Sequence, residues 1–175
     1  MLNNIERIEY RENNSIIARY HVVDEKLHGP YLGYCENGKL QCKMGYELGE
    51  LNGICYFYDD NEEIIQILRF QKNVLHGRAL LFNNNELVSY SKYKNGKLNG
   101  LTRTYYPGRI IQSTMNYTLG KLDGTVCYFD IRGYIIHQAE YRGGQLHGST
   151  ITYHDNQILK IEKYSNNQLI GVEDA

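Results

Sequence analysis

The chain has 175 residues, of which 22% are charged, and its formal net charge at pH 7 is −1. It contains no run of about 18 apolar residues and no charged-then-apolar N-terminus, so we expect neither a membrane-spanning helix nor a signal peptide. The four cysteines (Cys35, Cys42, Cys55 and Cys127) include no Cys-x-x-Cys pair. We therefore expect a reduced, cytoplasmic protein rather than a disulfide framework.

Residues 1–26 predict an N-terminal capping hairpin. Two strand-like runs, Ile5–Tyr10 and Ser15–Tyr20, flank a turn at residues 12–14. Tyr20 lies seven residues before Leu27, although the later repeats place an aromatic residue five before the leucine, and Glu25 stands where the others have Gly or Asn. Terminal repeats are usually atypical, because one side of them has no neighbouring repeat.

A Leu-x-Gly motif then recurs through the rest of the chain. Its glycines are Gly29, Gly53, Gly77, Gly100, Gly124, Gly148 and Gly171, at intervals of 24, 24, 23, 24, 24 and 23 residues. A fixed period of this size indicates a repeat architecture. We expect six repeats, at about 27–50, 51–74, 75–97, 98–121, 122–145 and 146–168, followed by a C-terminal tail at 169–175.

Each period reads as one β-hairpin. In the second repeat an aromatic and β-branched run at 54–58 precedes a turn cluster at 59–62, and a second run covers 64–70. The Asn, Asp and Gly residues of such turn clusters tolerate positive φ, which tight hairpin turns require. The predicted fold class is therefore all-β: an elongated single antiparallel sheet of consecutive β-hairpins with a period of 23 to 24 residues.

The stretch from Tyr93 to Gly100 connects one hairpin to the next. Two positions before each leucine stand Gly49, Asn73, Gly96, Gly120, Gly144 and Asn167. Gly and Asn are the residues that most readily adopt the left-handed conformation, so we expect a tight turn there. The glycine that ends the motif is expected to allow close approach of the neighbouring strand.

This pattern resembles the MORN repeat, and more closely the variant found in bacterial toxin–antitoxin-associated proteins. The match is clearest from Gly100 through Tyr105-Tyr106 to the stretch 117–124, and it extends over about residues 27–171. The resemblance implies a non-enzymatic protein-binding scaffold or an antitoxin-like or immunity-like module. It also implies an alternative, a peripheral module that binds anionic phospholipids.

Aromatic residues in step with the period are the candidate partner-binding residues. One set lies five residues before each leucine, and two more residues lie five after a glycine: Tyr46, Phe70, Tyr93, Tyr117, Tyr141 and Tyr164, with Tyr105 and Tyr153. Aromatic side chains often dominate the binding energy of protein interfaces. We expect them to form ladders on one face of the sheet.

Charges are separated along the chain. Residues 44–68 hold six acidic residues and no basic one, and residues 87–122 hold the opposite: Lys92, Lys94, Lys97, Arg103, Arg109 and Lys121 without an acid. These charges either solvate exposed strands or steer an acidic protein partner. The basic residues are also the only sequence support for phospholipid binding. Their interleaving with tyrosines at 90–109 could suit single-stranded nucleic acid, but the near-neutral total charge argues against that partner.

The sequence suggests no catalytic residue, metal or cofactor. His28, His76 and His147 precede repeat glycines, as Asn52, Asn99 and Asp123 do, but the histidines are at least two repeats apart. That spacing is about 20 Å, too far to share a zinc ion. We expect these side chains to bond the adjacent turn. The acidic stretch 59–63 lacks the ligand pattern of a calcium loop. No segment has the helical periodicity of the helix that must follow a phosphate-binding loop.

Overall fold

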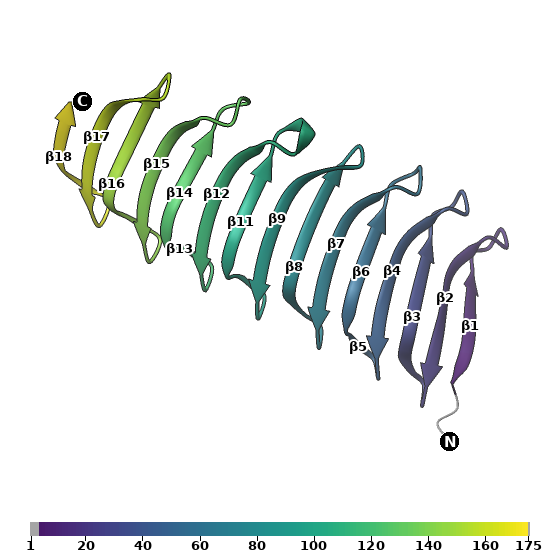
Figure 1. The fold of residues 1–175 in the computed structure, drawn as a ribbon. Helices are drawn as coiled ribbons and strands as arrows, with labels where there is room; N and C mark the ends of the chain where they lie inside the picture. The colour runs from purple at the N-terminus through teal and green to yellow at the C-terminus, as the bar shows by residue number, and fades with distance from the viewer. Residues whose placement is uncertain (1–3, 175) are drawn as a thin grey trace. The chain divides into compact units, whose positions relative to one another are not determined.

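A computed structural model of the chain describes residues 4–174. These residues form 18 strands and one short 3-10 helix (Figure 1). The predicted fold class is confirmed, because the structure is all-β and its strands form an open antiparallel sheet in hairpin order. Its contacts divide the chain into two compact units, one ending at Asn85 and the other beginning at Glu86. No helix within residues 4–174 is long and apolar enough to cross a membrane.

The first unit contains eight strands, each paired antiparallel with its neighbours in chain order. They are β1 (Ile5–Tyr10), β2 (Ile16–Val23), β3 (Lys26–Tyr34), β4 (Leu40–Glu47), β5 (Glu50–Leu51), β6 (Gly53–Tyr58), β7 (Ile64–Gln71) and β8 (Val74–Asn83). The exception is the short β5, which is separated from β6 by one residue: the two do not pair with each other, and both pair with β4.

The second unit repeats this arrangement. It contains β9 (Glu86–Lys94), β10 (Lys97–Leu98), β11 (Gly100–Tyr105), β12 (Ile111–Thr118), β13 (Lys121–Leu122), β14 (Gly124–Phe129), β15 (Ile135–Arg142), β16 (Gln145–His154), β17 (Gln157–Ser165) and β18 (Gln168–Asp174). The 3-10 helix η1 (Pro107–Arg109) forms the turn between β11 and β12. The strands pair antiparallel with their neighbours in chain order, except that β10 and β11 both pair with β9, and β13 and β14 both pair with β12.

The turns between repeats have the predicted left-handed backbone. The positions two before each leucine have φ values of 90°, 64°, 76°, 87°, 91° and 67° at Gly49, Asn73, Gly96, Gly120, Gly144 and Asn167. The residue before each of them also has positive φ, as type I′ turns require. In the N-terminal hairpin, Glu25 adopts the same conformation with φ 59° although it is neither Gly nor Asn.

The glycine that ends each motif has a different main role from the predicted one. From Gly29 to Gly148 these glycines have φ between 89° and 110°, which L side chains rarely adopt. A Cβ added at Gly53 would meet nothing within 4 Å, so close approach does not explain that glycine. At Gly148 the added Cβ would lie 2.0 Å from Glu140 Oε2. Backbone conformation is therefore the general requirement, and close approach adds to it only at some repeats.

Within the described residues, backbone hydrogen bonds join five of these six turns to the preceding repeat, all except the turn at Gly96. The amide of Gly49 donates to the Leu27 carbonyl at 2.7 Å, and Gly120 and Gly144 donate to Leu98 and Leu122 at 2.8 Å. A turn asparagine makes two hydrogen bonds to the preceding repeat, one through its backbone and one through its side chain. Asn73 N donates to Leu51 O at 2.9 Å, and Asn73 Oδ1 accepts from Leu51 N at 2.8 Å. The repeats are thus bonded along this edge as well as through strand pairing.

The polar residues before the repeat glycines partly follow their prediction. His28 Nδ1, Asn99 Oδ1 and Asp123 Oδ1 accept hydrogen bonds from the next turn, at Leu48 N (3.4 Å), Leu119 N (3.2 Å) and Gly143 N (3.3 Å). Asn52 instead bonds the turn that precedes it, because its Nδ2 donates to Glu47 Oε2 at 2.6 Å. At His147 the expected bond is not formed through Nδ1, which is buried without a hydrogen-bond partner among the described residues.

The N-terminal hairpin explains the displaced Tyr20. Val22 pairs with Leu27, so a valine occupies the place that an aromatic residue takes in later repeats. Tyr20 pairs instead with Tyr31, and their rings stack with centroids 5.8 Å apart. The predicted hairpin is present as β1 and β2, and its backbone turn is closed by hydrogen bonds between Arg11 and Ser15 and between Asn14 and Arg11.

Candidate binding faces

Strand register places the six aromatic residues before the leucines on one face of their unit. Residues directly opposite on neighbouring strands point to the same face. Tyr46 lies opposite Gly29 and Leu51, and Phe70 opposite Gly53 and Leu75. In the second unit, Tyr93 lies opposite Leu98, and Tyr117, Tyr141 and Tyr164 each lie opposite a repeat glycine and a repeat leucine. We call this the aromatic face of each unit and the other the reverse face.

An aromatic ring opposite a glycine fills the space that the missing side chain leaves, a known way to stabilise sheets. All six of these aromatic residues are half-buried, so part of each ring stays accessible. Burial raises the pKa of the Tyr46 and Tyr117 hydroxyls. The rings therefore serve the sheet and remain exposed to a partner at the same time.

Tyr105 and Tyr153 do not belong to these rows. The register shifts between Thr104 and Tyr105, and again between Thr152 and Tyr153, so each tyrosine lies at a β-bulge. An extra residue in a bulge interrupts the alternation of side chains. The prediction assumed uninterrupted ladders, and for these two residues the assumption is wrong.

Small buried residues form the centre of the aromatic face. In the first unit Ala18 and Cys55 are 0% exposed, and in the second unit Val126 is 2% exposed and pairs with Ala139. Burial also raises the pKa of the Cys55 thiol. The hydrophobic core is therefore one layer of side chains on this face, and no second sheet or helix of residues 4–174 packs over it.

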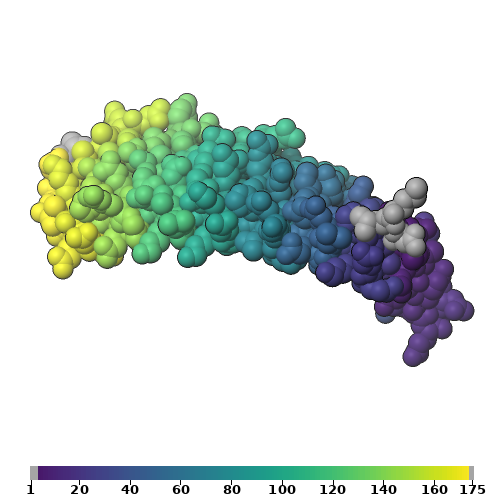
Figure 2. Space-filling model, turned by 90° about the horizontal axis from the view of Figure 1, so that it is seen from below, coloured from purple at the N-terminus to yellow at the C-terminus, as the bar shows by residue number. Residues whose placement is uncertain are grey.

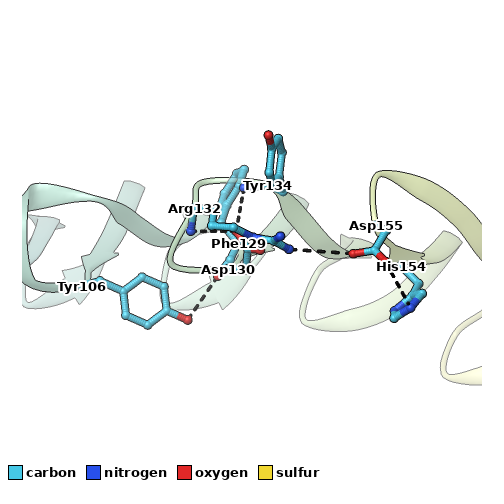
Figure 3. Close-up of polar contacts among 7 residues, drawn as sticks. All are labelled: Tyr106, Phe129, Asp130, Arg132, Tyr134, His154 and Asp155. Atoms are coloured by element: carbon cyan, nitrogen blue, oxygen red, sulfur yellow. Dashed lines mark hydrogen bonds and ion pairs between the residues drawn. The ribbon is translucent and has the colours of Figure 1, made fainter.

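A hollow of about 270 Å³ opens on the aromatic face of the second unit. Its lining comprises Thr104, Tyr106, Gln112, Ser113, Met115, Tyr128, Phe129 and Ile136. Most of its polar groups already bond one another: the Thr104 and Ser113 hydroxyls lie 2.6 Å apart, and Tyr106 Oη donates to the Phe129 carbonyl at 3.2 Å (Figure 3). Sequence reasoning missed this hollow, and the repeat pattern carries no signal for the register shifts at which Gln112 and Ile136 lie.

The predicted basic patch lies mostly behind the aromatic rows. Lys92 and Lys94 alternate with Tyr93 along β9, and Lys97, Arg103 and Lys121 alternate in the same way with residues of the aromatic face, which puts all five on the reverse face. Arg109 instead belongs to η1. None of the six forms an ion pair with a described residue.

One further cation extends this patch. Arg142 is exposed and pairs with Gln145 beside the turn that follows β15, at the repeat position of Lys94 and Thr118. Sequence reasoning missed Arg142 because the acid-free window ended at residue 122. A single flat partner could contact either the aromatic rows or these cations, but not both.

The turns within the hairpins of the second unit carry a separate set of polar contacts (Figure 3). Asp130 Oδ1 accepts from the amides of Arg132 and Tyr134 at 2.9 Å, and Arg132 Nε donates to Asp130 Oδ2 at 2.8 Å. Although partial desolvation opposes it, these hydrogen bonds hold the pKa of Asp130 below its usual value. Arg132 Nη2 also lies 3.9 Å from Asp155 Oδ1 in the next such turn. These charges therefore stabilise the turns.

The acidic stretch 59–63 is likewise a turn. Asp59 Oδ1 accepts hydrogen bonds from the amides of Asn61 and Glu63 at 2.8 and 2.9 Å, which confirms the structural interpretation of this stretch. Within residues 4–174, no group of three or more His, Cys, Asp or Glu side chains is arranged to hold a metal ion.

Comparison with known proteins identifies no family. No protein-family model matches the chain, and no curated protein matches it. One similar solved structure is that of a TarM mutant of S. aureus in complex with fondaparinux, alpha-GlcNAc-glycerol and UDP. The two share 16% identity with a TM-score of 0.30, over 66% of this chain and 20% of that one. The chain thus spans about a fifth of that protein's length, and so slight a likeness carries no functional argument.

Proposed function

We propose that this chain is a non-enzymatic, cytoplasmic protein-binding module of the MORN-repeat type, and that a protein partner binds its aromatic rows. An antitoxin-like or immunity-like role is the specific form of this proposal that the sequence resemblance favours. The partner needs no cofactor or nucleic acid to bind in this way.

The observation that carries the proposal is the combination of order and exposure in the rows. Six aromatic side chains are held in register by the opposing glycines and leucines, yet all remain half-exposed on a face that no other described element covers. Rigid aromatic side chains cost little conformational entropy on binding, which is why they concentrate binding energy at interfaces. In Figure 2 the residue colours of the second unit follow one another as bands, so each hairpin contributes its own strip of surface.

The test is a pull-down from native lysate with the tagged full chain at low and at physiological salt, read by mass spectrometry. We expect one stoichiometric protein that survives physiological salt. The double variant Tyr117→Ala with Tyr141→Ala should lose that protein, because it removes two neighbouring rings of the row. A small toxic protein as the captured partner would support the antitoxin-like form.

The matched control is Tyr105→Ala with Tyr153→Ala, which removes two tyrosines that lie at bulges outside the rows. This control variant should still bind the captured protein. Thermal melting of both variants is measured in parallel. Equal loss of partner from both variants, or unfolding of the row variant alone, would mean that the rows are structural and that the binding face is assigned wrongly.

The second candidate is a peripheral phospholipid-binding module. The observation in its favour is the group of reverse-face cations without ion pairs, since each cation near an anionic surface contributes about 1 kcal/mol. Flotation with anionic vesicles tests it. Binding that disappears in Lys92→Gln with Lys121→Gln, and also as salt rises, would support the lipid candidate over the protein partner.

A further inference from the structure

Two turns between repeats carry pairs of like charges that face each other directly. Seven such turns are flanked by an opposed pair on neighbouring strands: Val23–Lys26, Glu47–Glu50, Gln71–Val74, Lys94–Lys97, Thr118–Lys121, Arg142–Gln145 and Ser165–Gln168. Five of these pairs combine a neutral residue with a neutral or basic one. The remaining two are an acidic pair in the first unit and a basic pair in the second, at the same position of their repeats.

Like charges directly opposite on neighbouring strands destabilise a sheet. All four side chains are exposed, and none forms an ion pair with a residue of the described range 4–174. Asn52 donates one hydrogen bond to Glu47, and the Lys26 stem lies near Gly49 of the acidic turn, but neither supplies a bonded countercharge. The described chain therefore carries two repulsive pairs, and charges from outside could relieve them.

We propose that the acidic turn, Glu47 to Glu50, pairs with the basic turn, Lys94 to Lys97, of a second copy of this chain. Both turns have the same backbone form, with φ values of 49° and 90° at Leu48-Gly49 and of 51° and 76° at Asn95-Gly96. Two carboxylates and two ammonium groups are thus displayed across equivalent turns. Leu48, which is 50% exposed, adds an apolar contact at the tip of the acidic turn.

A second copy fits better than an anionic membrane because it carries a countercharge for both the acidic turn and the basic turn. Each copy offers one acidic and one basic turn, so the contact is reciprocal, as in a two-fold pair where residue i meets residue j and j meets i. A lipid surface would attract the basic turn and repel the acidic one. Each pair lies on the reverse face of its own unit, because Glu47 follows Tyr46 and Lys94 follows Tyr93 along their strands. This self-association therefore goes beyond the proposed function and leaves the aromatic rows accessible.

Sedimentation equilibrium of the full chain over a range of concentrations tests the proposal. We expect the weight-average mass to rise from 20.4 kDa towards twice that value in about 20 mM salt, and to return to 20.4 kDa in about 500 mM salt, where screening is strong. The variant Lys94→Glu with Lys97→Glu has two acidic turns, and the variant Glu47→Lys with Glu50→Lys has two basic ones. Each should stay at 20.4 kDa alone, and an equimolar mixture should associate again in low salt.

The matched control is Lys121→Glu with Arg142→Glu, which changes the net charge by the same amount on the same face but keeps both like-charge pairs. It should still associate. Far-UV circular dichroism checks folding, and Lys94→Gln with Lys97→Gln replaces any charge-reversed variant that does not fold. A wild-type chain that stays at 20.4 kDa in low salt would overturn the proposal. So would a mixture that fails to associate, a control that loses association completely, or a monomer that instead binds anionic vesicles.

Discussion

At Gly148 the backbone and a neighbouring side chain both oppose a Cβ atom. Its φ is 110°, and the added Cβ would lie 2.0 Å from the Glu140 oxygen that accepts a hydrogen bond from Ser149 N. Gly53 has nearly the same φ, 105°, but open space around it. The two glycines therefore separate the cost of backbone strain from the cost of a clash.

We predict that Gly53→Ala destabilises the protein by about 1–3 kcal/mol, the usual cost of holding an L residue in a sparsely populated backbone conformation. Gly148→Ala should cost roughly 1–3 kcal/mol more, because Glu140 must move and its hydrogen bond is lost. Urea unfolding of both variants measures the difference. Equal free energies of unfolding would show that the clash relaxes without cost.

The cysteines make a second residue-level prediction. Burial raises the pKa of the Cys42 and Cys55 thiols, so less thiolate is present at a given pH, and the thiolate is the reactive form. Cys35 and Cys127 are only half-buried. With a thiol-specific chromogenic reagent near pH 8, Cys35 and Cys127 should react first, and Cys42 and Cys55 only as the fold opens. Single Cys→Ser variants assign the phases, and four equal rates in the folded protein would contradict the prediction.

At the scale of the hairpin, Asn73 has two roles, and a glycine could take over only one of them. Its φ of 64° suits the turn, and its side chain and amide both bond Leu51 of the preceding repeat. Asn73→Gly keeps the backbone conformation and loses one hydrogen bond, so we expect a loss of about 1 kcal/mol. Asn73→Ala also strains the backbone and should lose about 2–3 kcal/mol. Chemical denaturation measures the free energy of unfolding of each variant. Equal values for Asn73→Ala and Asn73→Gly would show that the positive φ at this position costs an alanine little.

The hairpins and their turns could be predicted because their causes are local. A period of 23 to 24 residues places the strands, and Gly or Asn before each leucine identifies turns such as those at Gly49 and Asn73. The same reasoning predicted that His28, Asn99 and Asp123 would bond an adjacent turn, as they do. It could not foresee that Asn52 would bond Glu47, because that choice depends on which carboxylate lies nearby.

The distribution of side chains over the two faces was harder to predict because it depends on register. The basic residues were considered by their position along the chain, whereas alternation along β9 puts Lys92 and Lys94 on the face opposite Tyr93. Bulges then removed Tyr105 and Tyr153 from the expected ladders. The hollow around Tyr128 depends on such bulges too, since Gln112 and Ile136 lie at the register shifts. One extra residue per strand is not visible in a repeat pattern.

For the molecule as a whole, the pairing pattern makes stability a local property. Within each unit, a strand bonds only strands that are its neighbours in the chain, or one step further where β5, β10 and β13 interrupt a strand. The stability of such arrays is approximately a sum of terms from each repeat and from its contacts with adjacent repeats. A lesion in one hairpin should therefore weaken that hairpin and its neighbours most.

Hydrogen exchange in Gly148→Ala tests this at the scale of the chain. We expect amide protection to fall in β15 to β18, which surround the lesion, and to stay close to wild type in β2 to β7, because no strand pairing links those strands directly to β16. Gly33→Ala is the reciprocal variant, since its Cβ would lie 2.8 Å from Cys42 Sγ. It should loosen β2 to β4 and spare β15 to β18. A uniform loss of protection in either variant would mean that the chain unfolds as one cooperative body, in which distant repeats share their stability.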